Sequence, residues 1–169
     1  MQVIQHYELA SAASSIEFTS IPDTYTDLYV LFTDRNASVN DVASYLKFNA
    51  STSGYSVRRL IGTGSTASSQ SYSERIAGFS ENANFTANTF SNTALYIPNY
   101  TSSNQKSWSS DSVTENNGYS YAGIIAGLWT GTDAISTLTL SPNGGSFAQY
   151  SSATLYGITA GSDGTTTVS

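Results

Sequence analysis

Few side chains in this sequence have the type and spacing that catalysis requires. His6 is the only histidine, so a Ser-His-Asp triad would depend on it. It lies in a predicted first strand, where an edge position in contact with solvent is the simpler interpretation. Ser-x-x-Lys occurs at Ser44/Lys47 and Ser103/Lys106. Neither pair opens a predicted helix, as a nucleophile of that class requires, so chance in a serine-rich chain explains both.

The carboxylates are scattered and form no known metal-binding motif. Asp23 and Asp27 flank a turn, but the Asp-x-Asp-x-Asp-Gly spacing of a calcium loop is missing. Asp in turns usually caps its own backbone, and the chain has no Cys for a thiolate site. A glycoside hydrolase, which needs two carboxylates that face each other, remains an alternative. We predict a protein that is not an enzyme and that binds no metal or cofactor.

Composition indicates a folded domain with an unusual, weakly charged surface. Aromatic residues make up 12% of the 169 residues and charged residues only 11%, whereas 30 Ser and 21 Thr supply hydroxyls. A disordered chain would be poorer in aromatics and richer in charge. The length fits one domain, which we place at residues 1–161, with an extended tail at residues 162–169. The net charge of −6 argues against nucleic acid as a partner.

No segment has the features of a membrane anchor or a leader peptide. The longest apolar stretch, residues 121–129, is too short and too glycine-rich to span a bilayer as a helix. The N-terminal residues lack both a basic region and a continuous apolar region. We therefore expect no membrane partner and synthesis in a cytoplasm.

Alternation with a period of two residues dominates the chain. In residues 27–34, for example, Leu28, Val30 and Phe32 alternate with Tyr29 and Leu31, as in a strand with both faces covered. Clusters of Gly, Asn, Ser and Pro separate such stretches, and no helical periodicity is convincing. The pattern predicts some nine to eleven strands in antiparallel sheets, as a sandwich or a barrel.

Two hairpins are predicted from turn residues. Asn143-Gly144 within residues 142–145 suits a tight turn between two strands. In residues 96–117, residues 101–105 form a polar turn, and the strand after it places Lys106 and Trp108 on one face.

The aromatic residues could serve as core, as subunit contacts or as a platform for sugars. Core packing is the expectation for Trp129 and Tyr156, which lie in apolar strands. Tyr100 and Trp108 bracket a turn, so an exposed contact role is more credible for them.

Four longer stretches resemble, in order, a family of small virion proteins of tailed bacteriophages, especially marine phages. The stretches are FTSIPDTYTDLYVLF (18–32), YLKFNASTSGYSVRRLIGTGS (45–65), ANTFSNTALYIPNYTSSNQKSWSSDSVTENN (87–117) and AGLWTGTDAISTLTLSPNGGSFAQYSSATLYGI (126–158). Members of this family are described as head decoration or cement proteins and as tail-fibre modules. The resemblance covers roughly residues 3–158 and implies an all-β, jelly-roll-like antiparallel β-sandwich of about eight to eleven strands that assembles on the virion.

The leading functional expectation is a capsid decoration (cement) protein on the outer capsid surface. Its partner would be the major capsid protein, and it would form a homo-oligomer, with a trimer favoured. The expected contacts lie in residues 1–8, 100–107 and 162–169, with Tyr7, Tyr100, Lys106, Trp108 and Val168 as candidate contact residues. The alternative is a tail-fibre or receptor-binding module that recognises host-surface glycans. The absence of a repetitive fibre shaft favours the capsid.

Overall fold

Twelve β-strands make up the regular structure of the described residues of the protein, for which we use a computed structural model. The structure describes residues 1–38, 42–118 and 120–159, and no helix occurs in these ranges. The strands are β1 (Gln2–Glu8), β2 (Ile16–Phe18), β3 (Asp27–Thr33), β4 (Ala43–Phe48), β5 (Tyr55–Gly62), β6 (Ala67–Tyr72), β7 (Ile76–Phe79), β8 (Asn92–Ile97), β9 (Lys106–Thr114), β10 (Tyr121–Trp129), β11 (Leu138–Pro142) and β12 (Ser152–Ile158).

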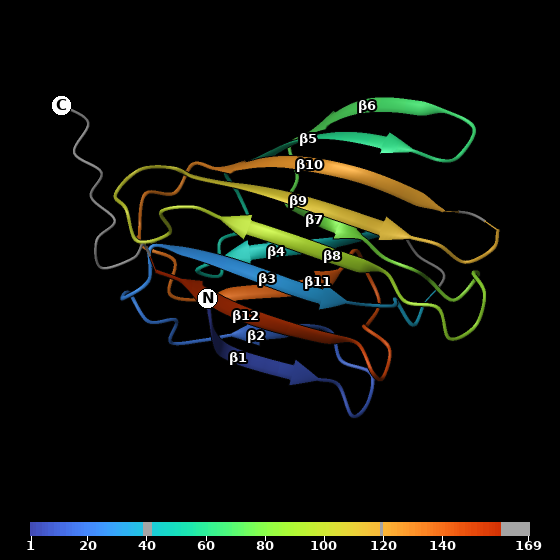
Figure 1. Ribbon diagram of the computed structural model, residues 1–169, viewed down its shortest axis with the longest axis horizontal. Helices are drawn as coiled ribbons and strands as arrows, with labels where there is room; N and C mark the ends of the chain where they lie inside the picture. Colours follow the sequence, from blue (N-terminus) through green and yellow to red (C-terminus); the bar gives the residue numbers. More distant parts are fainter. Residues whose placement is uncertain (39–41, 119, 160–169) are drawn as a thin grey trace.

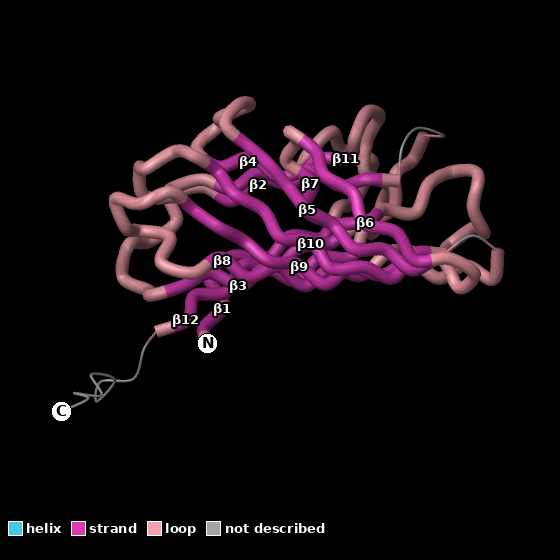
Figure 2. Tube along the Cα trace, turned by 90° about the horizontal axis from the view of Figure 1, so that it is seen from above, coloured by secondary structure: helices cyan, strands magenta, loops and turns pink. Residues whose placement is uncertain are grey.

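The strands form two antiparallel sheets that pack face to face (Figure 1). The larger sheet has the order β1-β12-β3-β8-β9-β10-β5-β6, and the smaller has the order β2-β11-β4-β7. In the view of Figure 2, the four-stranded sheet covers one face of the eight-stranded sheet. The predicted antiparallel β-sandwich is therefore confirmed, with twelve described strands where eight to eleven were expected.

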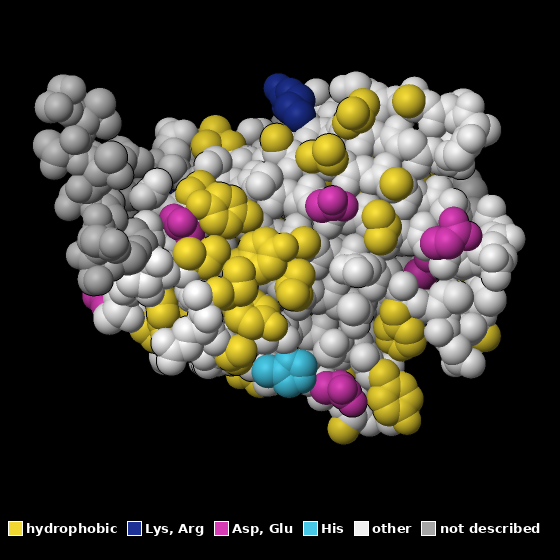
Figure 3. Space-filling view, viewed as in Figure 1, with side chains coloured by type: hydrophobic (Ala, Val, Ile, Leu, Met, Phe, Trp, Pro, Cys, Tyr) yellow, Lys and Arg dark blue, Asp and Glu magenta, His cyan; other side chains and the backbone are white. Residues whose placement is uncertain are grey.

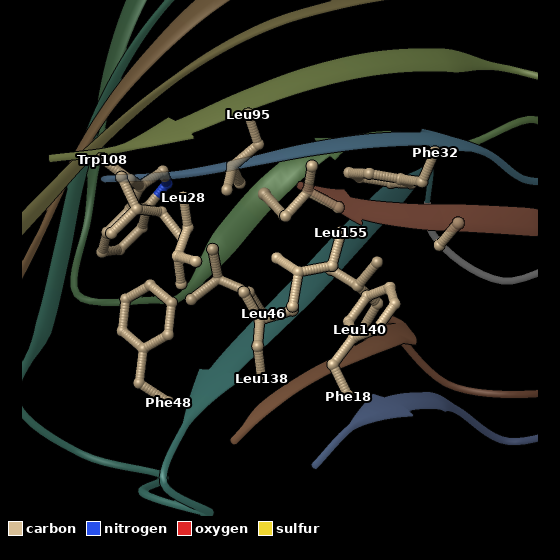
Figure 4. Close-up of a cluster of buried hydrophobic side chains, with 14 of the residues drawn as sticks. Phe18, Leu28, Phe32, Leu46, Phe48, Leu95, Trp108, Leu138, Leu140 and Leu155 are labelled. Carbon is tan, nitrogen blue, oxygen red and sulfur yellow. The ribbon is translucent and has the colours of Figure 1, made fainter. Parts of the chain in front are cut away.

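The core lies between the two sheets and is built from alternate residues of their strands. In β3, Leu28, Val30 and Phe32 point inward and are at most 2% exposed. Figure 4 shows such side chains from the larger sheet meeting those of the smaller sheet, among them Phe48 and Leu140. Because successive strand residues point to opposite faces, the intervening side chains of β3 lie on the outer face of the large sheet.

Strands β9 and β10 show how the sequence fits this core. Every second residue of β9, starting at Lys106, is buried, and the residues between them are exposed, so the predicted division into two faces is confirmed.

On the inward face of β10, two glycines leave room for aromatic rings. A Cβ on Gly123 would lie 2.7 Å from Phe79 Cε2, and a Cβ on Gly127 would overlap the Trp108 indole.

Hydroxyl groups join the two sheets at β7, all four residues of which are buried. Ser110 Oγ on β9 donates to the Ala77 carbonyl at 2.6 Å, and the Phe79 amide donates to Ser112 Oγ at 2.8 Å. Ser112 Oγ also lies 2.7 Å from Thr93 Oγ1 on β8. These inward hydroxyls satisfy backbone groups that no strand neighbour reaches on that side.

One of the two predicted hairpins is confirmed and the other is wrong. Strands β8 and β9 pair through the turn at residues 98–105, as expected for residues 96–117. The turn at residues 142–145 has positive φ at Gly144 and Gly145 but joins strands of different sheets. β11 pairs with β2 and β4, whereas β12 pairs with β1 and β3, so the chain crosses the sandwich there. The proposed tail at residues 162–169 lies outside the described residues.

Candidate functional site on the outer face of the eight-stranded sheet

His6 lies where the sequence predicted it, in the edge strand of the large sheet. It is exposed, and its Nδ1 atom is 2.7 Å from Thr154 Oγ1 on β12. Among the described hydrogen bonds, this contact with a hydroxyl group is the only one that the ring makes, and none joins it to a carboxylate. A hydroxyl partner fixes the ring but does not stabilise a positive charge on it, as a catalytic triad requires.

Two carboxylates are buried at one end of the sandwich, Asp34 at 1% and Glu81 at 0% exposure. Asp34 Oδ2 accepts a hydrogen bond from Ser44 Oγ at 2.6 Å, and Oδ1 accepts one from Ser91 Oγ. Desolvation raises the pKa of Asp34, and the hydroxyl donors partly oppose that rise. Asp34 is thus a structural acceptor that ties β4 and β8 to the end of β3.

Glu81 has one satisfied and one unsatisfied oxygen. Oε2 accepts from Asn116 Nδ2 at 2.9 Å, whereas Oε1 is buried with no hydrogen-bond partner. Desolvation raises the pKa of Glu81, the bond from Asn116 lowers it, and the positive charge of Arg35 also lowers it. This carboxyl is enclosed and is not exposed at the described surface, where a substrate would have to reach it.

Within the described ranges, no three His, Cys, Asp or Glu side chains lie close enough to hold a metal ion. Those ranges also contain no helix with the length and apolar character that a bilayer crossing needs.

Three of the predicted contact residues are buried, which corrects the expectation that they are exposed. Tyr100 is 0% exposed and donates its hydroxyl to the Pro22 carbonyl. Trp108 is 2% exposed, with its ring 5.8 Å from Phe48 and 6.1 Å from Tyr55. The turn between these two residues is polar, but its flanks insert into the core, because an aromatic side chain gains more by burial than by exposure.

Lys106, also predicted as a contact, is 1% exposed. Its Nζ atom donates to the carbonyls of Ser102 at 2.7 Å, Asn104 and Thr132 at 3.3 Å. Desolvation lowers the pKa of Lys106, and Asp133 opposes this. The ammonium group therefore closes the turn after β8 and offers nothing to a partner.

Tyr7 keeps an exposed surface, and Val168 lies outside the described residues. Tyr7 is 39% exposed, with its ring 5.5 Å from that of Phe18 at the open edge of the sandwich. Of the five candidate contact residues, it alone combines a described position with an accessible side chain.

The outer face of the large sheet carries a row of three tyrosines, which we call the tyrosine row: Tyr96 on β8, Tyr29 on β3 and Tyr156 on β12. Tyr29 pairs directly with both of the others across neighbouring strands. Tyr96 is 37% exposed, and the other two are half-buried. Figure 3 shows hydrophobic side chains gathered over these strands. The prediction that Tyr156 belongs to the core is wrong, because its neighbours Leu155 and Gly157 occupy the inward positions of β12.

Asp27 fixes one end of this row. Its Oδ2 accepts from the Tyr96 hydroxyl at 2.9 Å, and its Oδ1 accepts from the Asn99 amide at 2.8 Å. Because the phenol donates to a carboxylate, the pKa of Tyr96 is raised. Tyr96 is thus held in one orientation before any partner arrives, which lowers the entropy that binding costs.

A second apolar area lies on the same face over β10 and β5, and we call it the Leu60–Ile124 patch: Leu60, Ala122, Ile124 and Ala126. Leu60 is 56% and Ile124 61% exposed. Together with Asp111 and Ala67 they line a shallow hollow of about 420 Å³. The large sheet therefore presents aromatic and aliphatic groups outward, with few charges among them (Figure 3).

Sequence reasoning missed Tyr29 and the exposed positions of β10. The signal for Tyr29 was present, since it alternates with the three apolar residues that fill the core side of β3. Its partners were not visible, because Tyr96 and Tyr156 come from distant segments that only strand pairing brings beside it.

Comparisons of the chain with protein-family models, curated proteins and solved structures gave no match.

Proposed function

We propose that this protein is a structural virion protein that decorates and cements the outer surface of a tailed-phage capsid, without enzymatic activity. The observation that carries the proposal is the outer face of the large sheet. It presents the tyrosine row and neighbouring aliphatic side chains on paired strands, and tyrosine is among the residue types enriched at protein interfaces.

The strand order supports the proposal. In a jelly roll of eight strands, the first, eighth, third and sixth form one sheet, and the second, seventh, fourth and fifth form the other. We infer a jelly-roll derivative in which β2 is the first strand, the antiparallel β8-β9-β10 unit replaces the seventh, and β11 is the eighth. The orders β2-β11-β4-β7 and β3-β8-β9-β10-β5-β6 then follow the jelly-roll scheme, with β1 and β12 added beside β3.

Jelly rolls occur in viral capsid proteins and in lectins, so the fold alone does not determine the function. The sequence resemblance to phage virion proteins favours the capsid. In this role the major capsid protein would cover the tyrosine row, and binding only to the assembled shell would stabilise the shell by mass action.

The test is to mix the purified protein with capsids that lack it. We expect binding and a higher temperature of capsid disruption. The double substitution Tyr29→Ser/Tyr156→Ser should weaken binding at least tenfold, as expected for central aromatic contacts. Tyr150→Ser is the matched control, because Tyr150 is 62% exposed but lies outside the strands. Failure of the unaltered protein to bind, or binding without protection, would contradict the proposal.

A second candidate function is recognition of host-surface glycans by the same row. The observation that favours it is the hydrogen bond between Tyr96 and Asp27, since aromatic faces beside a carboxylate suit sugar rings with hydroxyl donors. Saturable binding to host cells or their polysaccharide, lost in Tyr29→Ser/Tyr156→Ser but kept in Tyr150→Ser, would support this function. Substitution of Tyr100 or Trp108 does not test it, because both are buried.

A further inference from the structure

The Leu60–Ile124 patch has a regular arrangement that follows from strand register. On β10, Ile124 pairs with Leu60 of β5 on one side and with Asp111 of β9 on the other. One outward position further along, Ala126 pairs with Arg58 of β5 and with Ser109 of β9. The six outward side chains thus form two parallel rows of three, with an aliphatic residue at the centre of each row.

The two charged residues of this arrangement lie at diagonally opposite corners. Arg58 and Asp111 are both exposed, and by strand geometry their Cα atoms are separated by roughly 12 Å. Within the described chain neither side chain has an ion-pair partner, and the one hydrogen bond of the Arg58 side chain goes from Nη1 to the adjacent Val57 carbonyl at 3.1 Å. The patch therefore carries one positive and one negative group, each available to a partner.

We propose that the Leu60–Ile124 patch binds a second copy of this chain in a two-fold, face-to-face dimer, in which Arg58 of each copy meets Asp111 of the other. In a face-to-face dimer, the two-fold axis lies in the plane of the interface. Each residue of one copy then lies over the residue of the other copy whose position is its mirror image across the axis. If the axis passes midway between Arg58 and Asp111 and is perpendicular to the line joining them, Arg58 of each copy lies over Asp111 of the other.

The same axis also brings the apolar groups together. It crosses both rows obliquely and passes between Leu60 and Ile124 in the first row, so these side chains of the two copies meet. The small side chain of Ala126 leaves a second shallow hollow, of about 260 Å³, which Arg58, Leu60 and Ile124 also line. The second copy's Ile124 fits into this hollow. An apolar centre with a charged rim is the usual composition of a specific interface. The proposal concerns the free protein and does not rest on the proposed capsid role.

The first test is the mass of the purified protein in solution, measured by sedimentation equilibrium. We expect a reversible dimer. Ile124→Glu should weaken self-association at least tenfold, because it places two like charges at the centre of the interface. Leu31→Glu, at a 39% exposed position on the same face, should leave the dimer unchanged. Unfolding curves of each variant establish that it is folded. A monomer at concentrations up to about 1 mM, or a trimer that ignores Ile124→Glu, would overturn the proposal.

Charge exchange gives the decisive test. Arg58→Glu and Asp111→Arg should each weaken self-association about tenfold or more, because like charges then oppose each other. The double variant Arg58→Glu/Asp111→Arg should recover to within about threefold of the original affinity. A mixture of the two single variants should form mixed dimers, since each supplies the charge that the other lacks. A double variant as weak as the single ones, or a mixture that stays monomeric, would refute the two-fold pairing.

Discussion

Gly127 on β10 lies directly opposite Trp108 on β9, and the indole ring occupies the space that a side chain at Gly127 would need. This contact lets Trp108 lie flat beneath the sheet and reach Phe48 on the other sheet. The glycine is therefore a packing requirement of the core.

We expect Gly127→Ala to lower the free energy of unfolding by about 1–3 kcal/mol, because the added methyl group forces the indole to move in a packed core. Gly62→Ala is the matched control on the neighbouring strand, since a Cβ there meets its nearest atom, the Ala122 carbonyl oxygen, at 3.8 Å. The control should change stability by less than about 0.5 kcal/mol. Urea unfolding measures both, and equal effects would contradict this account of Gly127.

Ser112→Ala should also destabilise the protein, by about 1–3 kcal/mol, because it leaves the buried Phe79 amide without an acceptor. The same change at Ser109, on the exposed side of β9, should have little effect. Hydrogen exchange at the Phe79 amide gives a local measurement, and we expect it to be faster in the Ser112→Ala variant alone. Unchanged protection there would show that the hydroxyl is dispensable.

Lys106→Met keeps the aliphatic stem but removes the donor to three carbonyl groups. We expect a loss of about 1–3 kcal/mol and faster hydrogen exchange in residues 101–105. Lys47→Met on β4, which replaces a half-exposed lysine, serves as the control. If both substitutions had the same small effect on the melting temperature, the ammonium group would not be what holds the turn.

The pH dependence of the free energy of unfolding should show the effect of burying the Glu81 carboxyl group. Burial raises its pKa above the ordinary value of a glutamate side chain, so the folded state favours the protonated form. Its contribution to stability is then fully present below that ordinary pKa and is lost as pH rises through the folded-state pKa. Glu81→Gln removes this loss, so the free energy of unfolding of the variant should rise relative to that of the unaltered protein as pH rises. Glu17→Gln, at an exposed position of β2, is the control in unfolding measured from pH 4 to pH 8. Equal gains in both variants would contradict this account of Glu81.

The candidate site was only partly accessible to sequence reasoning. The aromatic residues of the chain suggested a platform, but their types alone did not show which of them share a face. Trp108 and Tyr100 were preferred because they flank a polar turn, yet both belong to the core. Proximity to a turn describes the backbone, whereas exposure depends on which side of the strand the second sheet covers.

The sequence by itself determined the strands, their two faces and the weakly charged character of the surface. Residues of β9 divide into two sets by alternation alone, because successive side chains of any strand point to opposite sides. Only the tertiary structure decided that the set with Lys106 and Trp108 faces inward, since both sets are largely polar and either could meet water. It also decided that Tyr29 lies between Tyr96 and Tyr156, because backbone hydrogen bonds between distant segments set that register.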